Sequence, residues 1–479
     1  MNRAALAMGI WAAAASFAVM RERQAAACGG CFRPPTETAS DITDERMLLS
    51  VSTQQTTLYD PIQYTGNPSS FAWVIPIHGT VDVGLSADVL FDSVDALTQT
   101  TIQAPPLNCP FPSGCAQNAG PQAPGAFGAA SSGSGSSSGS GVTVVKAQNV
   151  GPYATVQLAT TDPMALNTWL LQNGFEIPTA VQPTLDAYVG EGFNFLAMKL
   201  LPGQGVQSMR PVRITFTGAL LSLPLRMAAI GTGATVGITI WVVADGRYEP
   251  QNFPFFHIED SQLVWDFSTS SSNYTTLRQQ NEQALGGKGW EMESSITLQE
   301  QSIANVILSG GVVYGYGYGG GSGGGTPADA SQDYLPITNP DGSVAETADQ
   351  VRDDDLKTLF AGIQGPSVHV TRIRSDISHA AMTTDFVLHA SQEQSDLSNV
   401  RDVTQSINEQ CPIYNNNCAV VGTGTPAQAA ASGPHAASGC SASTRGSSDL
   451  PVGLAAVAGF AGFAFVRSRR RQRRGDARR

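Results

Sequence analysis

Apolar and polar positions alternate over short stretches of this chain, so its first half predicts strands more often than helices. Residues 46–59 are rich in β-branched side chains and partly alternate, which predicts two strands that turn near Thr53–Gln55. Residues 71–77 form an apolar run that predicts a buried strand. Residues 88–101 repeat apolar side chains at helical spacing and predict a helix.

The central part of the chain mixes helices and strands. Asp162 is a favourable N-cap and Pro163 suits the first helical position, so a helix is predicted to begin there and to end at Asn173-Gly174. A second helix is predicted over 179–189. Strands are predicted at 142–147, 154–160, 193–201, 212–217, 225–230, 237–244 and 262–267.

The later part of the chain predicts two more helices and a closing pair of strands. We expect the helices over 274–285 and 345–364, and the strands over 368–374 and 382–388. Because helices alternate with strands only at the front of the central region, the fold class is predicted as α+β, with a largely antiparallel sheet and a few packed helices.

Low-complexity stretches divide the chain. Gly and Ser dominate 116–141, which cannot bury enough apolar surface to fold and is predicted to be a disordered linker. The predicted division is a signal peptide (1–27), an N-terminal β-rich region (28–115), the linker (116–141), a central α+β region (142–309), a Gly-rich loop that holds Tyr314, Tyr316 and Tyr318 (310–330), a closing helix and strand pair (331–418), a spacer (419–449), a transmembrane helix (450–466) and an arginine-rich cytoplasmic tail (467–479).

The two folded regions on either side of the linker are expected to share one core. Residues 46–101 supply too few strands to bury both faces of a sheet alone. The regions should therefore complete each other.

Both ends of the chain carry export features. Arg3 precedes an apolar run, and Ala25–Ala27 offer a small-residue cleavage site, as in a signal peptide. Leu450–Val466 is free of charge and just long enough to cross a hydrocarbon core as a helix. The arginines of 467–479 are expected to stay on the cytoplasmic side, which leaves the folded part outside.

Cys440 stands ahead of this apolar run, in Ser438-Gly439-Cys440-Ser441. The order of Gly-Cys, polar spacer, apolar span and terminal arginines resembles the MYXO-CTERM type of bacterial sorting signal. The resemblance implies a transient anchor in the inner membrane, cleavage near Cys440 by a sorting protease, and transfer to the cell surface or outer membrane. An ordinary single-span anchor with an incidental cysteine is the alternative.

The net charge narrows the choice of partners. The whole chain carries −12, but residues 1–27 contribute a net +2 and residues 467–479 a net +7, so the part between them is near −21. A body this acidic repels phosphate backbones, and we expect no nucleic-acid partner. An envelope protein or a polysaccharide remains open as a partner.

Cysteine usage fits an oxidising compartment. The seven cysteines fall into three close pairs, Cys28/Cys31, Cys109/Cys115 and Cys411/Cys418, plus the lone Cys440. We expect the close pairs to form local disulfides, although connectivity is not fixed by spacing. Cys28 directly follows the alanines and is an alternative lipidation site, but Ala25 stands where a lipoprotein signal has a larger aliphatic residue.

Recognised catalytic and metal-binding patterns are missing from the sequence, so no catalytic residue, cofactor or metal site is predicted. No His-Glu-x-x-His motif occurs, and no cysteine pair lies near a histidine at zinc-site spacing. His369, His379 and His389 recur every ten residues near an expected hairpin. They are the set that the alternative enzyme hypothesis would use, together with dispersed carboxylates.

Several motifs occur in the order found in a known family. They are Ala27-Cys-Gly-Gly-Cys-Phe32, Phe71-Ala-Trp-Val-Ile-Pro-Ile77, Val150-Gly-Pro-Tyr153, Trp169-Leu-Leu-Gln-Asn-Gly174 and Val370-Thr-Arg-Ile-Arg374. Together they resemble the bacterial DUF2330 family over roughly Cys28 to Ser391. The resemblance implies an exported, membrane-associated protein and supplies no catalytic residues. We therefore expect a non-enzymatic structural or binding protein of the cell envelope, with a surface hydrolase or other enzyme as the alternative.

Overall fold

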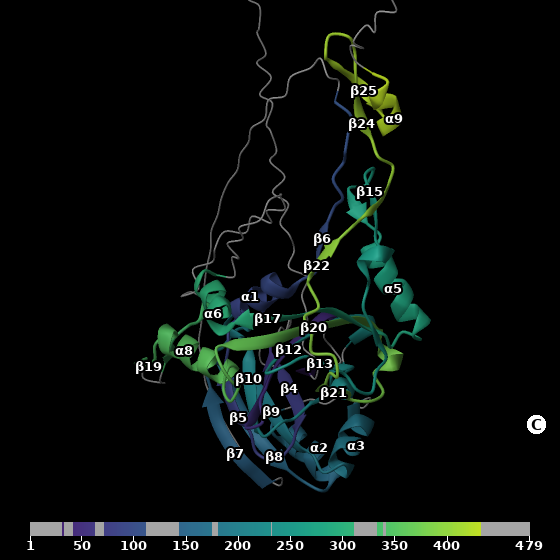
Figure 1. Cartoon of the computed structure of the whole chain (residues 1–479). Helices are drawn as coiled ribbons and strands as arrows, with labels where there is room; N and C mark the ends of the chain where they lie inside the picture. Colours follow the sequence, from purple (N-terminus) through teal and green to yellow (C-terminus); the bar gives the residue numbers. More distant parts are fainter. Residues whose placement is uncertain are drawn as a thin grey trace, which may run out of the picture.

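The computed structural model describes residues 31–32, 42–62, 71–111, 143–174, 181–230, 232–310, 333–338 and 342–432. In these residues two β-sheets lie face to face, helices cover their outer sides, and a narrow stalk extends from one end (Figure 1). The fold is α+β with mainly antiparallel pairing, which confirms the predicted class.

The larger sheet has eight strands. In spatial order they are β14 (Phe255–Phe256), β17 (Trp290–Gln299), β20 (Ser367–Ser378), β12 (Thr232–Ala244), β2 (Ile42–Val51), β3 (Gln55–Asp60), β10 (Val212–Thr217) and β5 (Asp82–Leu85). β12 pairs in parallel with β2 on one side and antiparallel with β20 on the other. A strand from late in the sequence therefore lies near the centre of this sheet.

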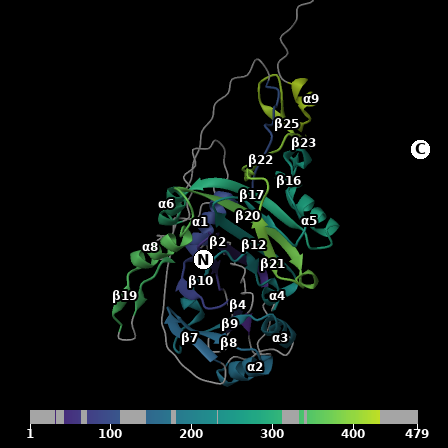
Figure 2. The same ribbon diagram turned by 60° about the horizontal axis from the view of Figure 1, so that its bottom comes forward.

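The smaller sheet has five strands. In spatial order they are β1 (Cys31–Phe32), β4 (Ala72–Ile77), β9 (Asn194–Leu200), β8 (Tyr153–Ala159) and β7 (Thr143–Val150). Its outer face is covered by α2 (Pro163–Gln172) and α3 (Gln182–Gly190), as Figure 2 shows. The Asp162 side chain accepts a hydrogen bond of 2.9 Å from the backbone N–H of Met164, so α2 begins at the predicted cap.

Alternation along the strands creates three apolar layers. On β2, Met47 and Leu49 face the smaller sheet, whereas Leu48 faces the opposite side. That opposite side is covered by α1 (Asp88–Thr98), α6 (Glu300–Leu308) and α8 (Ala348–Leu359). The order of layers is thus helices, large sheet, small sheet, helices.

Both sheets contain strands from before and after residues 112–142. In the large sheet β2 and β3 precede that stretch and pair with β12 and β10, which follow it. In the small sheet β4 pairs with β9. The expectation of one shared core is confirmed.

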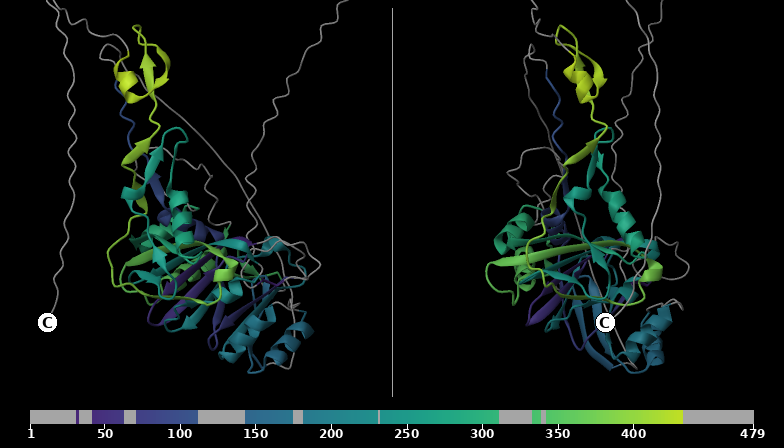
Figure 3. Two further views of the ribbon diagram at one scale, coloured as in Figure 1. Left: turned by 90° about the vertical axis from the view of Figure 1, so that its right-hand side faces the viewer. Right: turned by 45° about the vertical axis from the view of Figure 1, so that its right-hand side comes forward.

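The stalk is built from residues 101–106, 258–273 and 400–410. β6 (Thr101–Gln103) pairs in parallel with β22 (Val400–Asp402), and β15 (Val264–Asp266) lies between β16 (Ser271–Ser272) and β23 (Gln405–Ile407). Ile258, Leu263 and Val403 form a small buried core of its own. α5 (Tyr274–Ala284) joins this region to the large sheet, as the two views of Figure 3 show.

Shorter elements fill the edges. A three-stranded sheet has the order β11 (Ser222–Leu223), β21 (Phe386–Ala390) and β13 (Tyr248–Pro250), and β18 (Ile337–Thr338) pairs with β19 (Val344–Glu346). Single helical turns form η3 (Val206–Ser208), α4 (Leu225–Ala228), η4 (Asp260–Gln262) and η5 (His379–Ala381).

One predicted strand is wrong, and the two closing strands have other partners than each other. Residues 225–230 hold α4 in place of a strand, because the alternating burial of Leu225 and Met227 belongs to a helical turn that follows Pro224. The strands predicted at 368–374 and 382–388 do not pair with each other. β20 continues to Ser378, η5 turns the chain away, and β21 pairs with β11 and β13 instead.

Candidate functional site

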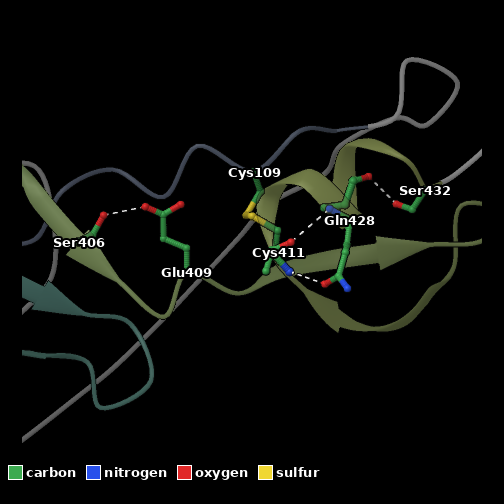
Figure 4. The surroundings of a disulfide bond; sticks show 8 residues. Cys109, Ser406, Glu409, Cys411, Gln428 and Ser432 are labelled. Atoms are coloured by element: carbon green, nitrogen blue, oxygen red, sulfur yellow. Dashed lines mark hydrogen bonds between the residues drawn. A yellow bond between two sulfur atoms is a disulfide. The ribbon is translucent and has the colours of Figure 1, made fainter. Parts of the chain in front are cut away.

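The far end of the stalk, which we call the tip, consists of residues 107–111 and 411–432. Cys109 is disulfide-bonded to Cys411, with a Cα–Cα distance of 5.3 Å and a sequence separation of 302 residues (Figure 4). The predicted local bonds Cys109/Cys115 and Cys411/Cys418 are therefore wrong. Cys418 is also disulfide-bonded.

Strand pairing explains the long-range bond. β6 and β22 run in parallel, with Thr101 opposite Val400 and Gln103 opposite Asp402. The two chains leave this pair in the same direction, so they reach the tip side by side. Cysteine spacing along the sequence carries no trace of this pairing.

The other cysteines of interest are only partly described. Cys28, Cys115 and Cys440 lie outside the described residues. Cys31 lies in β1, opposite Trp73 of β4. The expected processing and lipidation sites are thus untested by the geometry.

The tip is a small ordered unit. β24 (Cys411–Tyr414) and β25 (Val420–Gly424) form a hairpin, and α9 (Pro426–Ala430) folds back on it. Thr425 and Gln428 form a capping box at the start of α9, and Ser432 accepts a hydrogen bond of 3.1 Å from the backbone N–H of Tyr414. The predicted spacer therefore holds an ordered strand and helix in its first part, because these local bonds satisfy the backbone.

The three late histidines do not converge. His369 lies opposite Ala244 near one end of β20, whereas His379 follows Ser378 at the other end of this strand. His389 lies on β21 opposite Glu249, with its Nε2 3.4 Å from the Glu249 carboxylate. Among the described residues, His, Cys, Asp and Glu form no group of three suited to hold a metal ion.

His369 instead forms a polar cluster with Ser295 of the neighbouring strand β17 and with Thr371 of its own strand β20. Its Nε2 lies 2.7 Å from Ser295 Oγ, which is also 2.8 Å from Thr371 Oγ1. Its Nδ1 lies 4.0 Å from Asp396, beyond hydrogen-bond reach. Burial lowers the pKa of His369, and the nearby carboxylate of Asp396 only partly offsets this.

This cluster has the residue types of a catalytic triad but not its accessibility. Ser295 is fully buried, and its backbone N–H and C=O pair with Leu397 at 2.8 and 2.6 Å. A nucleophile needs an open approach on the side of its Oγ. The segment around Leu397 would have to move before a substrate reached Ser295. No sequence signal marked Ser295, since it lies in a strand without a recognised motif.

A second buried polar region lies where α5 meets the large sheet. Tyr274 Oη donates a hydrogen bond of 2.8 Å to Glu291, while Arg372 forms ion pairs with Asp95 and Glu293. Burial raises the pKa of Glu291 to about 8, and the neighbouring Glu293 charge adds to this shift. Glu291 is therefore largely protonated at neutral pH.

A depression opens between the two sheets near α4. Its empty volume is about 410 Å³ including the solvent at its mouth, and its lining is mainly apolar apart from His78, Thr56, Ser222 and Asp385. Arg226 donates to both carboxylate oxygens of Asp385, at 3.1 and 2.7 Å, and Tyr188 Oη donates at 2.6 Å. The carboxylate of Asp385 is thus already bound by Arg226 and Tyr188. Among the described residues that line the depression, no other Asp, Glu, Lys or Arg occurs.

The helices of the described residues are all too short or too polar to cross a membrane. The predicted span at 450–466 lies outside them. The membrane expectation therefore rests on sequence alone.

Comparison with known proteins gives a family and no activity. The family model described as "Uncharacterized protein conserved in bacteria (DUF2330)" matches residues 22–388. No curated protein matches the sequence. A crystal structure of a mutated baculovirus P35 after caspase cleavage is similar over 54% of this chain and 76% of its own, with 8% identity and a TM-score of 0.22. A TM-score this low carries no argument about fold or function.

Proposed function

We propose that this chain, which belongs to the DUF2330 family of bacterial proteins, is an exported, envelope-anchored protein with a structural or binding role. In this proposal it halts in the inner membrane through Leu450–Val466, is processed near Cys440 by a sorting protease, and moves to the cell surface or outer membrane. Its partner would be an envelope protein or a polysaccharide.

The observation that carries this proposal is the Cys109–Cys411 disulfide. It joins segments 302 residues apart and fixes the tip in one arrangement. Structural disulfides persist in oxidising compartments and are rare in the cytosol. Together with the predicted signal peptide, this bond supports folding after export.

The test compares the intact mass and cell fraction of the wild type with those of Cys440→Ala. We expect wild-type protein that lacks the arginine tail and is accessible at the surface, and a variant that stays whole in the inner membrane. Retention of Arg479 in both proteins would leave the tail as a plain anchor. Recovery of reduced Cys109 from cytosolic protein would contradict export altogether.

The second candidate function is hydrolysis, which the Ser295–His369 contact of 2.7 Å favours. It requires the segment around Leu397 to open. A fluorophosphonate probe should then label Ser295 in the wild type and not in His369→Ala, whereas His379→Ala should label normally. A folded wild type that carries no label at Ser295 would contradict this candidate.

A further inference from the structure

The tip differs from the rest of the molecule in its charge. Residues 107–111 and 411–432 contain no Asp, Glu, Lys, Arg or His, although the chain between the two terminal segments is near −21. Charges repel over about one Debye length, ~8 Å at physiological ionic strength. The tip is therefore a part of the surface that can approach an anionic surface without local repulsion.

The tip also exposes apolar side chains. Val420 and Val421 are 58% and 63% exposed, and Leu107 and Phe111 are each 37% exposed. The Phe111 ring packs edge-on against Tyr414 at 5.3 Å. An exposed apolar patch marks a surface that contacts a partner or a membrane, and tyrosine is enriched at membrane–water interfaces.

The position at which the chain leaves the described structure indicates which surface the tip meets. The last described residue is Ser432, next to α9, and 17 residues separate it from the predicted span at Leu450. For comparison, a random coil of 17 residues has a root-mean-square reach of about 20–25 Å. Attachment at Cys440 instead would bring the tip still closer.

We propose that the tip is the membrane-facing end of the molecule and rests on the lipid surface through Val420, Val421 and Phe111. This inference rests on the proposed membrane attachment. The body, with its acidic surface and the depression between the sheets, then points away from the bilayer. Attachment through Cys28 would give a different orientation, because that residue precedes β1 in the small sheet.

The test uses the full-length chain in vesicles of phosphatidylethanolamine with a minor fraction of phosphatidylglycerol. Hydrogen exchange of the amides in β25 is compared between vesicles and detergent micelles. We expect exchange in vesicles to slow by about tenfold or more at β25. Val144 and Val145, a second exposed valine pair on strand β7 (39% and 43% exposed), should exchange equally in both media.

A variant pair gives the matched control. Val420→Asp/Val421→Asp should abolish the protection of β25, and Val144→Asp/Val145→Asp should leave it unchanged. Equal exchange of β25 in both media overturns the inference. Protection that grows with the protein-to-lipid ratio, or that also occurs in concentrated micelles, overturns it in favour of contact with a second copy.

Vesicle flotation tests the proposed membrane attachment separately from the proposed orientation of the tip. If the wild-type chain floats and β25 is unprotected, only the orientation of the tip is wrong. If the chain does not float, the proposed attachment through Leu450–Val466 fails as well. Flotation with protection of β25 supports both.

Discussion

Asp355 is a buried carboxylate on α8 that three side chains satisfy. Ser86 Oγ donates at 2.6 Å, Tyr334 Oη at 2.8 Å and Arg213 Nη1 at 3.1 Å. Burial raises the pKa of Asp355, while Arg213 and the hydrogen bonds oppose this shift. The group is costly to bury and is held by its partners.

Removing this carboxylate should strongly destabilise the body. In Asp355→Ala the Arg213 guanidinium loses a buried partner, and we expect the free energy of unfolding to fall by about 3–5 kcal/mol. The measurement is urea unfolding. Asp353→Ala is the matched control on the same helix, because Asp353 pairs with Arg352 at the surface and should cost at most about 1 kcal/mol. Similar losses in both variants would contradict the assigned role.

Glu291 should make stability depend on pH. The pKa of its carboxyl rises from 4.5 to about 8 on folding, mainly through burial. Between these values only the folded state keeps the proton, so the stability contributed by Glu291 is full below about pH 4.5 and is lost as the pH rises through about 8.

Glu291→Gln should therefore flatten the pH dependence. One proton corresponds to a slope of about 1.4 kcal/mol per pH unit, and the variant should lose up to that slope between pH 5 and 8. Buried Asp60, whose pKa burial raises to about 7, should keep part of the dependence. The measurement is unfolding by urea at several pH values, with the exposed Glu346→Gln as control. An unchanged slope in Glu291→Gln would show that this carboxyl is ionised in the fold.

At the scale of elements, the disulfide should hold the tip and not the body. The described tip has a two-stranded hairpin and one short helix, which have little stability of their own. In Cys109→Ser/Cys411→Ser we expect amide exchange in β24 and β25 to accelerate by at least tenfold. Amides of α8 should be unaffected, because that helix packs in the main core. Equal acceleration in α8 would mean that the bond stabilises the whole fold.

Elements with regular periodicity were predictable from the sequence. β10 lies at 212–217 as predicted, and α2 begins at Pro163 because its cap and first turn are local features. β17 and α6 were missed. β17 carries buried glutamates at positions 291 and 293, which lie next to Tyr274 and Arg372. These glutamates interrupt the apolar pattern that predicts a buried strand.

Long-range partners were not predictable. The cysteine pairs that are close in sequence suggested local bonds, whereas parallel pairing of β6 with β22 sets the real one. The contact of Ser295 with His369 depends likewise on the register of β17 with β20. The ten-residue spacing suggested that His369, His379 and His389 could converge. In the structure His379 lies in η5 and His389 in β21, and only His369 lies in β20.

At the scale of the whole molecule, one core should survive a broken chain. Strands from both sides of residues 112–142 share both sheets, so cleavage in the Gly/Ser stretch should leave the two fragments together in native buffer. Size-exclusion chromatography of the nicked protein tests this. Because the disulfides of the tip can also link the fragments, the experiment needs the Cys109→Ser/Cys411→Ser variant under reducing conditions, which open the disulfide of Cys418 as well. Separation of its fragments would contradict a shared core.

The central position of β20 also governs when folding can finish. β20 spans 367–378, and it lies between β12 and β17, which come much earlier in the sequence. The large sheet cannot close until nearly the whole folded region has been synthesised, and its contacts between distant residues make closure slow. A chain that stays open for so long suits a secretion channel, which passes unfolded polypeptide. In the export that we propose, this late closure would keep the chain unfolded while it crosses the membrane, and the disulfide of the tip would form afterwards.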